Sequence, residues 1–195
     1  MSLFDPVYAF IFAGLFSPGP NVILLLASGA RFGARATWPH ILGVAVGVGI
    51  IGACVGFGIG ALLIAQPKLA FTLKCIAAVW ILWMAWSLFS ASGGLKKGSA
   101  DKPFTFIEAI FFQWINPKIW AVAVAASAGY PLGLPPESEA LRLAMGFTGI
   151  NFFVCTFWTY FGEGISRFLK TEHAWLIFRR TMAVLLALSA LLIFR

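Results

Sequence analysis

Two short segments combine proline with asparagine inside otherwise apolar stretches. The first consists of Ser17, Pro18, Gly19, Pro20 and Asn21, and the second of Asn116, Pro117 and Lys118. Proline lacks a backbone N–H and clashes with the carbonyl four residues earlier, so both segments predict an interrupted helix. Freed carbonyls suit an ammonium group, and the N-terminus of the helix that restarts near Pro20 suits a carboxylate. The segments therefore predict a small-molecule binding site; a simple proline kink that helps to pack helices is the alternative.

Lys118 lies near the middle of residues 109–136, where Tyr130 has the only other ionisable side chain. A charge at the centre of a membrane span costs about 2.5–3.5 kcal/mol and usually faces a cavity or a partner. We expect Lys118 to contact a substrate carboxylate or to lose its proton during a cycle; the alternative is that it reaches the membrane surface. Gln113, one turn earlier, is predicted to belong to the same site. Asn151 is predicted to line it too, although Asn151 could instead tie helices together.

Glu108 and Glu163 are the acidic candidates for proton exchange, together with Lys118. A carboxylate that faces a cavity within the membrane can couple transport to a proton gradient. The alternative is that both residues lie near the membrane surface and pair with basic side chains. His40 and His173 fall at loop or interface positions, so we expect both to contact solvent.

The elements that position these residues belong in a lipid bilayer. Of 195 residues, 61% are hydrophobic and only 11% are charged, and the mean hydropathy is +0.92. Soluble domains average about 45–50% apolar and about 25% charged residues, so the composition excludes a soluble enzyme or a nucleic-acid binder. The net charge of +7 comes from basic residues placed singly or in pairs between apolar runs. Such residues set membrane topology, so no nucleic-acid partner is expected.

Five uncharged stretches of 18 to 32 residues and a weaker sixth stretch predict membrane-spanning helices, because about 20 apolar residues cross a bilayer. The predicted spans are 6–28, 39–65, 70–91, 106–128, 142–165 and 174–194. The loops after the first, third and fifth spans carry seven basic residues, against four on the other side. This asymmetry predicts that those loops are cytoplasmic and that both termini lie outside.

A polar linker at 93–103 divides the chain near its midpoint. Three spans on each side would give the halves, about 1–92 and 104–195, opposite orientations. Pro18 and Pro117 are 99 residues apart, so the two interruptions occupy corresponding positions. The predicted fold is an all-α membrane protein: one transmembrane domain over 1–195, with six helices as an inverted 3+3 repeat and broken first and fourth helices. Paired interruptions of this kind mark transporter sites at the bilayer midplane.

Other side chains in the spans receive ordinary structural interpretations. Glycines at four-residue intervals in the second span, Gly43 and Gly47 and then Gly52, Gly56 and Gly60, predict close helix approach. Trp114 and Trp120 flank the second interruption and could touch substrate. The three cysteines are far apart and expected to be free thiols, and no metal site or other cofactor is predicted. Asp5 and Asp101 both lie outside the spans, so an aspartyl pair for intramembrane catalysis is absent and no enzyme is predicted.

At these motifs the chain resembles the LysE-type translocators, a family of lysine, homoserine and threonine exporters. The resemblance rests on the segment 17–21, on Gly33, on Gly43-x-x-x-Gly47 and on the segment 116–118, and it extends over nearly the whole chain. The spacing Gln113-x-x-Asn116-x-Lys118 and the ending Ile193-Phe194-Arg195 are most similar to the branch that exports cysteine and O-acetylserine. The tryptophans around the second interruption depart from the family pattern and leave room for a more hydrophobic substrate.

The resemblance implies a proton-driven exporter of amino acids or their derivatives in the bacterial cytoplasmic (inner) membrane. Its expected partners are membrane lipids, an amino-acid substrate and protons, and a homo-oligomer stays open. The alternatives are an exporter of metal ions or other small molecules with the same fold, and a membrane scaffold that transports nothing. Clustered Cys, His or Asp ligands, which a metal exporter would need, are absent from the sequence pattern.

Overall fold

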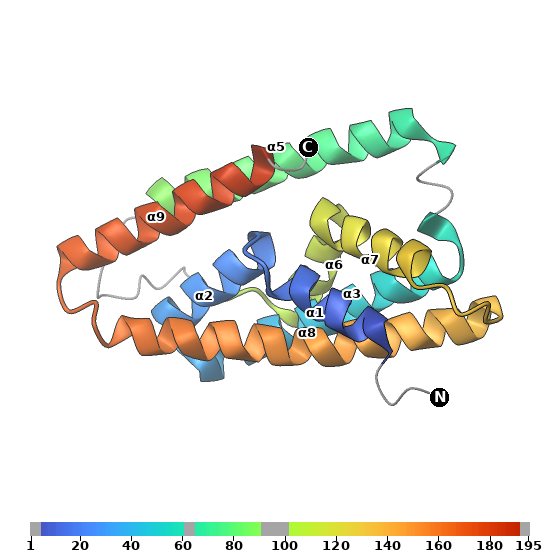
Figure 1. Cartoon of the computed structure of the whole chain (residues 1–195). Helices are drawn as coiled ribbons and strands as arrows, with labels where there is room; N and C mark the ends of the chain where they lie inside the picture. Colours follow the sequence, from blue (N-terminus) through green and yellow to red (C-terminus); the bar gives the residue numbers. More distant parts are fainter. Residues whose placement is uncertain (1–4, 61–64, 91–101, 192–195) are drawn as a thin grey trace.

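The computed structural model describes residues 5–60, 65–90 and 102–191, and these are helical almost throughout (Figure 1). The helices, with the labels of Figure 1, are α1 (Pro6–Phe16), α2 (Pro20–Phe32), α3 (Ala34–Gly56), α5 (Pro67–Ser90), α6 (Phe106–Ile115), α7 (Pro117–Gly129), α8 (Pro136–Ser166) and α9 (Glu172–Leu191). The predicted linker falls mainly on 91–101, and the motif at 193–195 and part of the predicted second span also lie outside the described residues.

Helix starts follow local chemistry. The Asp5 carboxylate accepts a hydrogen bond from the Val7 backbone N–H at 3.1 Å and so caps α1. At α6, Thr105 and Glu108 form a reciprocal capping box, which satisfies two backbone N–H groups that the helix leaves free. Five of the described helices, α1, α2, α5, α7 and α8, begin with a proline, which costs no hydrogen bond at the first helical position.

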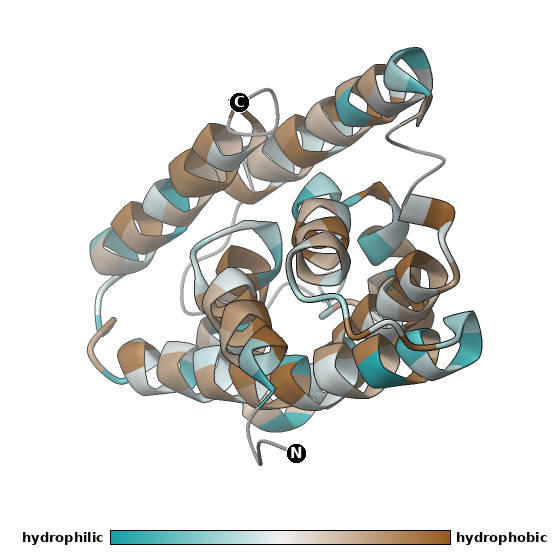
Figure 2. Cartoon of the chain, turned by 45° about the vertical axis from the view of Figure 1, so that its right-hand side comes forward, coloured by the Kyte–Doolittle hydropathy of each residue, from teal (hydrophilic) through white to brown (hydrophobic). Residues whose placement is uncertain are grey.

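Four described helices are each long and apolar enough to cross a membrane, and the bent pairs α1–α2 and α6–α7 bring the number to as many as six. The prediction of a multi-pass helical protein with interrupted first and fourth spans is confirmed at this level. Figure 2 shows that much of the hydrophilic colour lies toward the helix ends, as expected when loops contact water and the middle contacts lipid.

The predicted loop at 29–38 is wrong, because α2 continues to Phe32 and α3 starts at Ala34. Gly33 alone reverses the chain, with a φ of 84° that favours glycine. The carboxylate of Glu163 on α8 accepts a hydrogen bond from the Ala34 N–H at 3.0 Å. A single glycine and one capping carboxylate thus replace a ten-residue loop.

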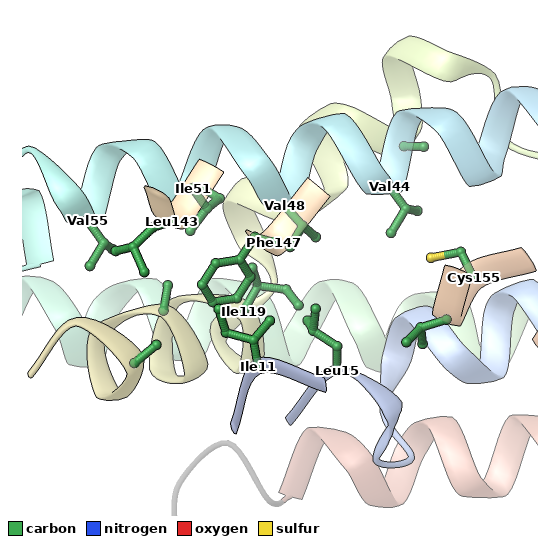
Figure 3. Packing of buried hydrophobic residues seen from close by; sticks show 14 of the residues in the cluster. Ile11, Leu15, Val44, Val48, Ile51, Val55, Ile119, Leu143, Phe147 and Cys155 are labelled. Atoms are coloured by element: carbon green, nitrogen blue, oxygen red, sulfur yellow. The ribbon is translucent and has the colours of Figure 1, made fainter. Parts of the chain in front are cut away.

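The core forms where α3 packs against α8 and α6, and α2 packs against α8. Figure 3 shows side chains from α1, α3, α7 and α8 meeting around Phe147, which is fully buried. The expected close approaches of α3 are present: Gly43 and Gly47 lie against α6, and Gly52 and Gly56 lie against α8. An added Cβ at Gly43 would collide with the backbone of Phe106.

Helices α5 and α9 pack mainly against each other and form a separate layer above the rest in Figure 1. Most of their apolar side chains are exposed, including Trp83 on α5 and Val184 on α9.

Near the N-terminal end of α8, Arg142 donates hydrogen bonds to Asp5 at 2.7 Å, to Glu139 at 2.9 Å and to the Tyr130 carbonyl at 3.2 Å. Arg142 stands at the first position of the predicted fifth span, and its side chain is only 7% exposed and ties α1 and the end of α7 to α8.

Candidate functional site

The two interruptions are sharp bends. The axes of α1 and α2 differ by 59°, and those of α6 and α7 differ by 67°. Ser17 ends α1, and Gly19 precedes α2 with an extended backbone. Asn116 is the single extended residue between α6 and α7. Each bend places the carbonyl end of one half-helix beside the amide end of the next, so partial charges of both signs meet there.

The fold brings the two bends together, although 101 residues separate Ser17 from Lys118. The Lys118 ammonium donates a hydrogen bond to the Ser17 carbonyl. Gly19 lies against the aliphatic part of the same lysine, where an added Cβ would come within 2.9 Å of Cδ. The freed Ser17 carbonyl, which would suit a substrate ammonium, is therefore hydrogen-bonded to the Lys118 ammonium in this structure.

A pair of buried amides makes the second connection between the bends. Asn21 Nδ2 donates to Gln113 Oε1 at 2.8 Å, and Gln113 Nε2 donates to Asn21 Oδ1 at 3.2 Å. Gln113 also donates to the Ala109 carbonyl one turn earlier at 2.9 Å. Both side chains are buried, with exposures of 9% for Asn21 and 0% for Gln113. This pair fixes the first turn of α2 against the last turn of α6.

A small void of about 10 Å³ lies between the bends and is closed by α8. Predicted site residues among its lining are Gly19, Asn21, Asn116, Lys118 and Asn151. Such a volume holds about one water molecule. The chain in this structure is therefore closed around the site, and an amino acid could enter only after the surrounding helices separate.

Several polar groups at this void lack a hydrogen-bond partner among the described residues. Both side-chain polar atoms of Asn116, Nδ2 of Asn151 and Nε1 of Trp158 are buried in this way. A buried polar group without a partner costs free energy, in the range of about 1–3 kcal/mol. These groups are consequently available to a bound molecule or to water.

Helix α8 supplies a wall that the sequence analysis recognised only at Asn151. Val154, Cys155 and Trp158 also line the void. Together with Asn151 they follow the spacing i, i+3, i+4 and i+7, which places all four on one helix face. The seven-residue spacing of Trp158 from Asn151 is the sequence signal for this position.

Not every residue of the interruptions reaches the void. Ser17 and Pro18 are exposed, and the Ser17 hydroxyl donates to the Gly14 carbonyl at 2.8 Å. Pro20 is buried and Pro117 is half-buried, but neither lines the void. The prolines act by stopping one helix and starting the next.

Trp114 and Trp120, predicted as possible substrate contacts, contact each other across the second bend. Their ring centroids are 5.9 Å apart, and the Trp120 indole N–H donates to the Trp114 carbonyl at 3.0 Å. The bond satisfies a carbonyl that the bend leaves free. Neither ring lines the void.

The two acidic candidates lie away from the void. Glu108 belongs to the capping box of α6, and Glu163 caps the start of α3. Neither is among the lining residues. Of the three proton-coupling candidates, the structure brings only Lys118 to the bends.

The expectation for His40 is wrong. The side chain is 2% exposed, because the short junction at Gly33 brings the first turns of α3 into the protein interior. His173 is exposed, as expected. Within the described part of the chain, no three His, Cys, Asp or Glu side chains gather in a group that could hold a metal ion.

Comparison with known proteins gives a family match and several relatives. The sequence model for the LysE type translocator matches residues 12–195. Proteins named cysteine/O-acetylserine efflux protein, from Escherichia coli strain K12 and from Shigella flexneri serotype 5b, are each 28% identical over 159 residues, which cover 79% of this chain and 79% of theirs. No solved structure matches the chain.

Proposed function

The chain belongs to the LysE type translocator family, and from that premise we propose that it is a proton-coupled secondary exporter of amino acids or their close derivatives. The relatives named for efflux of cysteine and O-acetylserine favour small polar amino acids as the substrate class. The observation that carries the proposal is the meeting of two broken helices around buried polar groups that lack partners.

Membership in the family also confirms three coarser predictions. The chain is a translocator and not an enzyme, because the family and the named relatives are transport proteins. Several apolar helices and the bacterial relatives make it a multi-pass protein of the cytoplasmic membrane. The resemblance identified from the segments at 17–21 and 116–118 is confirmed by the family match.

The substrate zwitterion binds between the bends in this proposal. The substrate carboxylate replaces the Ser17 carbonyl as the hydrogen-bond partner of the Lys118 ammonium, and it also faces the free N–H groups at the start of α2. The substrate ammonium then donates hydrogen bonds to the Ser17 carbonyl, which Lys118 has left, and to the side-chain oxygen of Asn116. Asn151 and Trp158 supply further hydrogen bonds from α8. Before binding, the Lys118 ammonium donates to the neutral Ser17 carbonyl, and the substrate carboxylate supplies it with a counter-charge.

The closed void requires movement for transport. Each bend joins two half-helices that restart at a proline, and the bends are similar in angle, which supports the inverted repeat with halves at about 1–92 and 104–195. Rocking of one half against the other would enlarge the void toward one side of the membrane at a time. Lys118, which both binds the carboxylate and contacts the other half, is the proposed site of proton exchange.

Flux measurements in proteoliposomes test this function. Vesicles are loaded with radiolabelled cysteine, O-acetylserine, threonine or lysine, and a pH gradient is imposed, with protein-free vesicles as the control. The expected result is protein-dependent efflux of at least one of these compounds, faster when the receiving side is acidic. Folded, reconstituted protein that moves none of them, or moves them at a rate independent of the gradient, would overturn the proposed coupled export.

A further inference from the structure

Helix α8 runs along the length of the molecule (Figure 1), and its middle lines the void at the bends. Arg142 lies in its second turn and Glu163 near its end, 21 residues apart. At the rise of an α-helix this spacing is about 30 Å, which matches the hydrocarbon core of a bilayer. Asn151 and Cys155, which line the void, lie between them. The two residues therefore mark the two ends of a path through the void.

Toward Glu163, the helices that close the void are in backbone contact. The half-helices that lead from the bends to this end are α2 and α6. An added Cβ at Gly29 of α2 would meet the Thr159 carbonyl of α8, and one at Gly43 of α3 would meet the Phe106 carbonyl of α6. Rotation of a side chain cannot open such a contact, because two backbones have to separate.

Toward Arg142, the corresponding half-helices α1 and α7 meet their neighbours through side chains. An added Cβ at Gly146 of α8 would meet the ring of Tyr8 on α1. One at Gly60, which follows α3, would meet the side chain of Val124 on α7. Side chains can change rotamer when a helix shifts, so this end is the weaker of the two barriers.

Arg142 connects three helices at this weaker end. From α8, its guanidinium donates to the Asp5 carboxylate before α1 at 2.7 Å and to the Tyr130 carbonyl at the end of α7 at 3.2 Å. The third partner, Glu139, at 2.9 Å, belongs to α8 itself and therefore holds no second helix. The planar guanidinium offers five donors in a fixed arrangement, so this one side chain holds both α1 and α7 against α8.

We propose that Arg142 keeps a gate closed. When its bonds to Asp5 and to the Tyr130 carbonyl break, α1 and α7 move away from α8 and open the void toward this end, while the end at Glu163 stays shut. Helices α3 and α8 remain joined at Gly56, where an added Cβ would meet the backbone of Ala140. On this side the proposed movement of the halves is therefore confined to α1 and α7.

The role of this gate in transport rests on the proposed function, but access to the void can be measured without substrate or gradient. Cys155 is a native reporter, because it lines the void and is 1% exposed. Replacing Cys54 and Cys75 by alanine leaves Cys155 as the only thiol. Right-side-out and inside-out membrane vesicles are treated with a cationic, membrane-impermeant thiosulfonate. The thiols that remain are then counted with a fluorescent maleimide after denaturation.

Two reference variants identify the ends of the path. Ser138→Cys and Lys170→Cys are each made in a chain without the native cysteines, and both positions are exposed, at opposite ends of α8. The vesicle in which Ser138→Cys reacts presents the end at Arg142. The assignment of sides in this test is thus independent of the predicted topology.

Arg142→Gln is expected to raise the rate of Cys155 modification about fivefold, and only from the end marked by Ser138→Cys. Asp5→Asn keeps an acceptor to cap α1 and weakens the pair, so a smaller rise from the same end is expected. Glu139→Gln is the matched control, because it removes a partner of Arg142 without removing a bond between helices. Glu163→Ala should raise the rate from neither end, because the backbone contacts there remain.

A rise from both ends in Arg142→Gln would indicate general loosening and would overturn the gate. An unchanged rate, or an equal rise in Glu139→Gln, would overturn it as well. If Arg142→Gln does not fold, Asp5→Asn decides: a one-sided rise supports the gate and no rise overturns it. A one-sided rise in a protein that moves no amino acid in proteoliposomes would overturn the proposed export and leave the gate standing. Export without the one-sided rise would do the reverse.

Discussion

Asn21 on α2 and Gln113 on α6 exchange two hydrogen bonds across 92 residues of sequence, at 2.8 Å and 3.2 Å. Each amide uses both its donor and its acceptor on the other, and both are buried. Asn21 follows the first bend, and Gln113 precedes the second bend, by only a few residues. Their pairing therefore sets the distance between the two bends. Any movement that opens the void has to carry this pair along or break it.

Gln113→Leu is expected to destabilise the protein, because it leaves the Asn21 amide buried without its partner. The loss should be about 0.6–1.7 kcal/mol, the range for polar contacts between helices in membranes. Unfolding by denaturant titration in detergent micelles measures the change in free energy. Gln66→Leu, at an exposed position outside the helices, is the control and should have little effect.

A double-mutant cycle separates the pair from its surroundings. Asn21→Leu and Gln113→Leu are combined, and the double variant should lose less free energy than the sum of the two single variants. Strict additivity would show that the two amides do not interact in the folded protein.

Lys118→Met is expected to reduce export at least tenfold while the protein stays folded. The substitution keeps an unbranched side chain as far as Cε but removes the ammonium that bonds to Ser17, and hydrogen bonds to charged groups contribute about 1.5–3 kcal/mol. Initial flux from proteoliposomes gives the rate, and Tm reports folding. Lys74→Met on α5 is the matched control, because Lys74 is also half-buried in an apolar helix. Equal flux in the two variants would remove Lys118 from the mechanism.

Gly29→Ala is expected to destabilise the contact between α2 and α8. A Cβ at Gly29 would collide with the backbone of Thr159, and backbone atoms cannot turn aside as a flexible side chain can. The cost should be on the order of 1–3 kcal/mol, visible as a lower Tm and a lower yield of folded protein. The control is Gly149→Ala in α8, where an added Cβ meets open space, so Tm should stay unchanged or rise.

Stability should fall in acid through Asp5. The hydrogen bond from Arg142 lowers the pKa of the Asp5 carboxyl below its ordinary value. A lowered pKa contributes stability above the pKa of the unfolded chain, and this contribution is lost as the pH falls through the pKa of the folded protein. The size should be at most about 1 kcal/mol, since the pair is partly open to solvent. Asp5→Asn should have a lower Tm than the unaltered protein at pH 6, and the difference should shrink by pH 3. Glu137→Gln, at an exposed position, should show no such convergence.

The sequence alone determined that the chain lies in a membrane and where its helices break. Apolar length is a local property, and each interruption follows from prolines that cannot continue a helix. Lys118 was recognisable as a site residue because a lone charge in an apolar stretch needs a partner, but the sequence could not name that partner.

The tertiary structure decided which groups meet. The pairing of Lys118 with Ser17 and of Asn21 with Gln113 depends on helix packing over about a hundred residues, which no local pattern encodes. The same packing moved His40 into the interior and set the Glu163 carboxylate against the start of α3, because the chain turns at Gly33 alone and the free N–H groups there need acceptors. Glu108 instead caps its own helix through the local pair with Thr105. Trp158 reached the void for a comparable reason: helical spacing put it on the face of α8 that carries Asn151, and only the position of α8 turned that face toward the bends.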